Sequence, residues 1–194
     1  SAILLFFLTV IAGLPMPMIA VQLLWLNLIA NGLQDVALAF EPKEGNELSC
    51  LPRSPDEAVF DKHLIEHILI SGTVMGGLAF LNYYWALQQG ESIENARNLT
   101  LMLMVLFGNI RAINARSESR SLFSQPINAN PFLMLAVPGA LLIHIAALYT
   151  PGLSSVLEIQ PISLIQLGQL LLIASSLFVV EEVYKWWRRR QSAS

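Results

Sequence analysis

An otherwise apolar run near the start of the chain carries four polar side chains at helical spacing: Asn27, Asn31, Gln34 and Asp35. Their positions, i, i+4, i+7 and i+8, place them along one face of a helix, with Gly32 in the middle. Amide and carboxylate oxygens suit a hard cation, and a glycine that weakens the helix can free carbonyl oxygens as further ligands. The pattern predicts a stripe that binds or conducts a cation, with hydrogen bonding between neighbouring helices as the alternative.

Other residues that could do chemistry are few. Cys50 is the only cysteine, so it cannot form an intrachain disulfide. His63 and His67 lie where a polar loop meets an apolar run, and we expect them to be solvated or near lipid headgroups. His144 stands alone on an apolar helix, which favours a packed polar contact. No Walker loop, zinc-protease helix or Gly-x-Ser-x-Gly elbow is present, so the sequence predicts no catalytic site in this chain.

The composition defines the elements that must position the stripe. Of 194 residues, 55% are hydrophobic and only 13% are charged, a balance far from that of a soluble domain. Apolar stretches near the ~20 residues needed to cross a bilayer recur along the chain. The net charge of -3, without a basic stripe, excludes a nucleic-acid partner. The predicted fold class is an all-α membrane protein, a single domain of about six transmembrane helices with the first one truncated.

The expected spans cover residues 1–12, 18–40, 64–87, 95–113, 131–149 and 162–183. Gly72 and Gly76 lie four apart in the third span, which allows another helix to approach closely, and we expect that helix to be the first. Of the 11 Lys and Arg residues, only Arg97 falls on the opposite side when the spans alternate. This bias predicts that loops 41–63 and 114–130 and the C-terminus are cytoplasmic.

Two segments carry a resemblance to a known family. The run Val21-Gln-Leu-Leu-Trp-Leu-Asn-Leu-Ile-Ala-Asn-Gly-Leu is followed by Leu51-Pro-Arg-Ser-Pro55. This pair resembles the sixth transmembrane helix and the following cytoplasmic loop of P-type cation pumps, most closely the calcium pumps of the sarcoplasmic reticulum type. The resemblance covers essentially the whole chain and implies that its spans are the fifth to tenth helices of such a pump.

The same resemblance implies roles for individual positions. Asn27 matches an ion-ligating asparagine of the family and is the implied metal ligand. Other positions depart from the calcium-pump pattern. Asn31 occupies the place of an aspartate and Ala30 that of a threonine, while Gly108 and Ala2 stand where glutamates are expected. Because a dehydrated divalent cation needs several carboxylate oxygens, these departures favour a proton or a monovalent cation, or acidic ligands on other helices.

The predicted function is the membrane ion pathway of an ATP-driven cation pump. The resemblance implies that ATP and Mg²⁺ bind to further domains of the same protein, and that the partners are those domains, the remaining helices, membrane lipid and the transported cation. Two alternatives remain open at this stage. One is a secondary transporter or channel that works without ATP, and the other is a structural bundle whose ion site has decayed.

Overall fold

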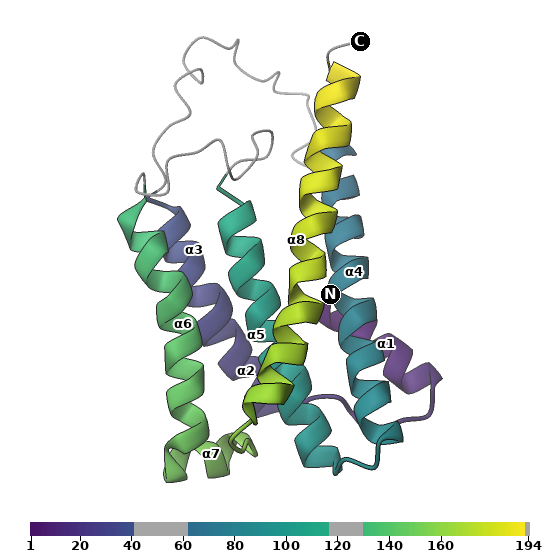
Figure 1. The fold of residues 1–194 in the computed structure, drawn as a ribbon, viewed down its shortest axis with the longest axis vertical. Helices are drawn as coiled ribbons and strands as arrows, with labels where there is room; N and C mark the ends of the chain where they lie inside the picture. Colours follow the sequence, from purple (N-terminus) through teal and green to yellow (C-terminus); the bar gives the residue numbers. More distant parts are fainter. Residues whose placement is uncertain (41–61, 117–129, 193–194) are drawn as a thin grey trace.

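A computed structural model of the chain describes residues 1–40, 62–116 and 130–192, and this part is all-α (Figure 1). Its elements are α1 (Ala2–Ile11), α2 (Ala20–Leu26), the π-helix η1 (Asn27–Gly32), α3 (Leu33–Leu38), α4 (Lys62–Gln88), α5 (Ile93–Asn114), α6 (Pro131–Tyr149), α7 (Pro151–Leu157) and α8 (Leu164–Ser192). The chain is therefore an all-α membrane helical bundle.

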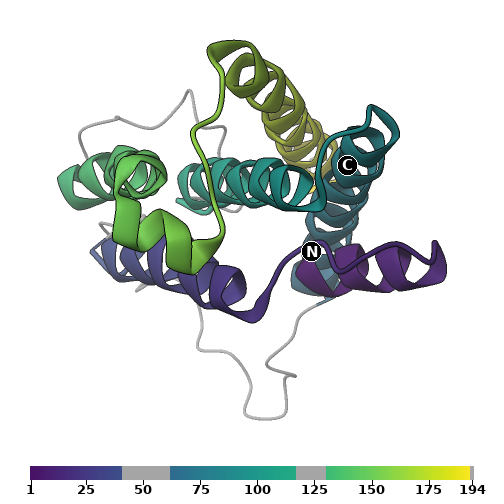
Figure 2. The same cartoon turned by 90° about the horizontal axis from the view of Figure 1, so that it is seen from below.

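Helix α5 is the centre of the bundle. Figure 2 shows it surrounded by the other long helices, and it contacts α2, α3, α4, α6 and α8. Its residues 98–107 are all buried, including the polar Asn98 and Thr100. A helix enclosed by protein does not have to be apolar on every face, which explains why polar side chains are tolerated along it.

Three described helices are long and apolar enough to cross a membrane by length and composition: Ile65–Gln88, Pro131–Tyr149 and Leu164–Arg188. The other three predicted spans fall short of that measure for different reasons. α1 has only 10 residues. Residues 20–38 form one continuous helical segment, but η1 divides it. α5 is long enough, but it carries Glu94, Arg97 and Arg111, which make its composition less apolar.

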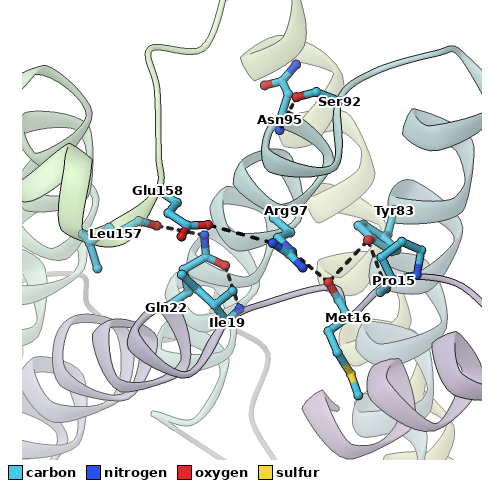
Figure 3. Close-up of polar contacts among 10 residues, drawn as sticks. All are labelled: Pro15, Met16, Ile19, Gln22, Tyr83, Ser92, Asn95, Arg97, Leu157 and Glu158. Carbon is cyan, nitrogen blue, oxygen red and sulfur yellow. Dashed lines mark hydrogen bonds and ion pairs between the residues drawn. The ribbon is translucent and has the colours of Figure 1, made fainter.

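The connection between α1 and α2 is fixed by polar contacts at one end of the bundle (Figure 3). The Tyr83 hydroxyl donates to the carbonyl oxygen of Pro15 at 3.1 Å, and Arg97 Nε donates to that of Met16 at 2.9 Å. At the start of α2, Gln22 Nε2 donates to the carbonyl oxygen of Leu157 at 2.9 Å. These bonds hold the entry of α2 against α4, α5 and α7, and so they position the polar stripe that follows.

The observed elements differ from the expected spans in three places. The second span, expected as one helix over 18–40, begins at Ala20 and contains a π-helical turn. α8 continues to Ser192, well past the expected limit of 183, because its charged C-terminal residues extend the helix beyond the apolar part. The short helix α7 begins at Pro151, directly after α6, where no element was expected.

Candidate functional site

The polar stripe surrounds a change in helix geometry. Residues 27–32 form the π-helix η1, which joins α2 to α3 without a break. Single π-helical turns of this kind are rare and occur frequently at functional sites. A Cβ added at Gly32 would lie 3.5 Å from the carbonyl oxygen of Asn27, an ordinary contact, so glycine is not required there by space. The helix was expected to be weakened at this point, and it widens instead of unwinding.

A cavity of about 290 Å³ lies beside η1. Three of the four predicted stripe residues line it: Asn27, Gln34 and Asp35. Gln34 is 3% exposed, whereas Asn27 and Asp35 are exposed among the described residues. Asn31 belongs to η1, but its side chain lies outside the described part of the structure. The stripe therefore contributes two amides and one carboxylate to a single cavity.

The opposite walls of this cavity come from α1, α4 and α5. Ala2 and Gly108, the two positions at which the family resemblance implies a missing glutamate, both line it. The cavity thus coincides with the place where that resemblance locates an ion site. Arg111, one turn after Gly108 on α5, lines it as well. The sequence interpretation placed Arg111 among the cytoplasmic basic residues, although its spacing from Gly108 puts both on one helix face.

Charge and hydrogen bonding define what the cavity can hold. Asp35 and Arg111 bring one negative and one positive formal charge to its wall. Gln34 Nε2 donates to Oδ1 of Asn109, which anchors α3 on α5. Among the described residues, no group of three or more His, Cys, Asp or Glu side chains is arranged to hold a metal ion. This part of the cavity therefore offers a ligand amide oxygens and a single carboxylate.

The two glycines predicted for helix packing lie where α4 meets α1. A Cβ on Gly76 would lie 2.7 Å from the carbonyl oxygen of Ser1 and 2.9 Å from Cβ of Leu4, so the two backbones approach too closely for any larger residue. At Gly72 the nearest atom, the nitrogen of Ser1, would be 3.6 Å away, an ordinary contact. The close approach at Gly76 holds α1 at the edge of the cavity.

Two histidines make contacts between helices. His144 is fully buried on α6, and its Nδ1 accepts a hydrogen bond from the indole nitrogen of Trp25 on α2 at 3.0 Å. The interpretation of His144 as a packed polar contact describes this arrangement. His67 was expected to be solvated or near headgroups; its side chain is 34% exposed, and it also pairs with a buried acid. Its Nε2 lies 2.5 Å from Oε2 of the buried Glu181 on α8.

The fold and the cavity define a class of protein: a helical membrane bundle with a cavity lined in part by polar side chains. Comparison with known protein families assigns the chain more specifically. A family model described as "Cation transporting ATPase, C-terminus" matches residues 15–187. The chain therefore belongs to the C-terminal region of cation-transporting ATPases, similar to the calcium-pump type, and is an integral membrane protein.

Individual relatives agree with this family. The chain is 30% identical over 190 residues to calcium-transporting ATPase type 2C member 2 of Mus musculus, covering 97% of this chain and 20% of the relative. It is 27% identical over 215 residues to the endoplasmic reticulum calcium ATPase srcA of Aspergillus fumigatus, covering 95% and 22%. A probable cation-transporting ATPase F of Mycobacterium bovis is 27% identical over 168 residues, covering 87% and 19%. The chain spans about one fifth of the length of these relatives.

Proposed function

We propose that this chain is the membrane ion-pathway portion of an ATP-driven cation pump, and that the cavity beside η1 binds the transported cation. The observation that carries the proposal is the meeting of Asn27, Gln34 and Asp35 with Ala2 and Gly108 around one cavity. Polar side chains at membrane depth are costly unless they serve a pathway or pair with one another. Because these side chains line a cavity, their arrangement favours an ion pathway over mutual hydrogen bonding alone.

ATP would be used elsewhere in the protein. The relatives are about five times as long as this chain, which supports further domains that bind ATP and Mg²⁺ and take the phosphate. Their phosphorylation would drive the rearrangement of these helices, with loop 41–63 passing movement between the two parts. The partners of the chain are then those domains, the remaining transmembrane helices, membrane lipid and the transported cation, with no nucleic acid.

The charges around the cavity favour a proton or a monovalent cation as the transported ion. Asp35 and Arg111 cancel formally, whereas a dehydrated calcium ion is normally held by several carboxylate oxygens. Calcium is the second candidate because the relatives from mouse and Aspergillus fumigatus are named as calcium pumps. In that case the remaining acidic ligands would come from other helices of the protein.

We also propose an orientation. The ends of α3, α5 and α8 and the starts of α4 and α6 lie at one end of the bundle (Figure 1). In the sequence, all Lys and Arg residues except Arg97 fall in these helix ends or in the segments that follow or connect them, which supports placing loops 41–63 and 114–130 and the C-terminus in the cytoplasm. Trp186 and Trp187 are about half exposed, and the guanidinium of Arg190 lies 3.9 Å from the ring centroid of Trp186. Such a cluster suits an interfacial anchor.

The test is the ATPase activity of the full-length protein, purified in lipid, against a panel of cations and a range of pH. We expect activity that depends on pH or on a monovalent cation, together with uptake of that ion into sealed vesicles. Stimulation by micromolar calcium with calcium uptake would select the second candidate. Ion movement that persists without ATP hydrolysis would contradict the pump proposal.

A further inference from the structure

A second cavity, of about 270 Å³, lies between α4, α5 and α8, and Ser1, just before α1, lines it as well. His67 and Ser71 line it from α4, Asn114 from α5 and Glu181 from α8. None of these four residues belongs to the polar stripe. The cavity therefore brings together a carboxylate, an imidazole, a hydroxyl and an amide from three helices.

Glu181 is the acid of this group, and its side chain is deeply buried, with only 2% exposed. Its Oε2 lies 2.5 Å from Nε2 of His67, and its Oε1 accepts a hydrogen bond from the Ser71 hydroxyl at 2.5 Å. Both carboxylate oxygens are therefore paired. Burying a carboxylate is costly unless partners of this kind are provided, so the site is built to keep Glu181 inside the bundle.

Asn114 faces the same cavity with its hydrogen-bonding capacity unused. Its side chain is buried, and within the described part of the chain neither its Nδ2 nor its Oδ1 has a hydrogen-bond partner. Leaving a buried amide unpaired costs about 1–3 kcal/mol. A cavity of this size that is lined by several polar groups can hold water, which would satisfy the amide. Asn114 thus marks the cavity as a place where water or another small polar ligand binds.

The surrounding charges select among small cations. Arg111 on α5 lines the cavity, and Lys185, one turn after Glu181 on α8, donates through Nζ to the carbonyl oxygen of Asn114 at 2.9 Å. The ring of Tyr184 stacks on His67, with 5.3 Å between the centroids. Two fixed positive groups oppose the entry of a metal cation. A proton, in contrast, binds by forming a covalent N–H bond with His67, and the neighbouring Glu181 carboxylate offsets its positive charge.

We propose that this second cavity is a proton-binding site, in which His67 and Glu181 share the proton and Ser71 and Asn114 hold water around them. In the unloaded state His67 is neutral, and its Nε2–H donates to the Glu181 carboxylate. A proton then binds to Nδ1 of His67 and forms an imidazolium that remains paired with Glu181, and its departure restores the neutral ring. The His67 side chain is 34% exposed, which gives the proton a route to the ring.

This site neighbours the proposed ion cavity, because Arg111 lines both. A positive charge on His67 would therefore repel the Arg111 guanidinium, and through Arg111 it would affect the electrostatic environment of Asp35. The proposal itself depends only on the cluster of α4, α5 and α8, so it can hold whichever ion occupies the first cavity.

The experiment is infrared difference spectroscopy of the full-length protein in lipid, between high and low pH, with proton uptake measured in parallel by an indicator dye. We expect bands of a histidine ring and of a carboxylate that change together. His67→Gln and Glu181→Gln should each remove these paired bands, and His67→Gln should lower uptake by about one proton per chain. The matched control is Glu182→Gln, which alters the neighbouring carboxylate outside the cavity and should keep them.

A milder variant keeps the test valid if Glu181→Gln fails to fold. Ser71→Ala removes one hydrogen bond to Glu181 and should move the frequency of the carboxylate band while the histidine band remains. Unchanged spectra and unchanged proton uptake in both His67→Gln and Ser71→Ala would overturn the proposal. Because these readouts need neither ATP nor the transported ion, their failure is distinguishable from failure of the proposed pump function.

Discussion

The side-chain amide nitrogen of Gln34 on α3 donates a hydrogen bond to the side-chain oxygen of Asn109 on α5, and both residues are buried. The bond joins the helix segment after η1 to the central helix of the bundle. Gln34 is thus a buried cavity-lining residue bonded to a neighbouring helix, whereas Asn27 and Asp35, which line the same cavity, are exposed. The stripe accordingly includes a bond between helices, which was the alternative interpretation of its pattern, beside two residues that line the cavity, while cation binding stays a prediction.

This bond can be measured by a double-mutant cycle with Gln34→Met and Asn109→Leu. Each single change removes one partner and leaves the other without this bond, so we expect each to destabilise the protein. The coupling energy should be about 0.5–2 kcal/mol, the range found for polar contacts between membrane helices. The measurement is thermal unfolding in detergent, and Gln89→Met in the exposed turn after α4 is the control. A coupling energy near zero would mean that the bond does not hold α3 on α5.

The packing of α1 on α4 makes a sharper prediction, because two adjacent glycines differ in their surroundings. A Cβ on Gly76 would meet the backbone of Ser1, whereas a Cβ on Gly77 would have no atom within 4 Å. We expect Gly76→Ala to destabilise the bundle by about 1–3 kcal/mol through overpacking. Gly77→Ala should be neutral or slightly stabilising, because alanine favours helix by up to about 1 kcal/mol. Equal effects of the two substitutions on thermal stability would contradict the close approach at Gly76.

Local sequence chemistry predicted the parts of the fold that depend on neighbours in the chain. α6 runs from Pro131 to Tyr149, the range expected from its apolar run. The stripe could be read from helical spacing alone. The end of α8 could not, because hydropathy marks where a helix leaves the membrane, whereas the charged residues after Val183 continue the same helix.

Features that depend on distant residues were not predictable from one sequence. His67 was interpreted from its position beside a loop, but its partner Glu181 lies 114 residues away. The contacts that hold η1 in place, such as the bond between Trp25 and His144, likewise span long separations, here 119 residues. Nothing in the residues near His67 or Trp25 indicates which helix will lie beside them.

The proposed orientation predicts where the chain can be labelled. Cys50 lies outside the described residues, in loop 41–63, and is the only cysteine. In sealed vesicles with the cytoplasmic side outward, a membrane-impermeant maleimide should label Cys50 without detergent. Replacing it by Cys50→Ser and adding Gln89→Cys in the turn between α4 and α5 should make labelling depend on detergent. The opposite pattern would reverse the orientation.

The last prediction concerns Asp35, the only carboxylate of the stripe and, of the described residues, the one acidic side chain that lines the cavity beside η1. Asp35→Asn removes the charge and keeps nearly the same shape, so we expect the full-length protein to insert and unfold as the parent does. Its ion-stimulated ATPase activity should weaken, or its pH dependence should move, because a carboxylate no longer compensates a passing cation or carries a proton. Asn27→Ala should lower the apparent affinity for the ion, since it removes the ligand implied by the family pattern. Val36→Ala, at the exposed apolar residue next to Asp35, is the matched control and should leave both properties unchanged. If Asp35→Asn keeps the parent activity across pH and ion concentration, Asp35 serves only to solvate the helix end, and the charge of the ion must be met by carboxylates outside this chain.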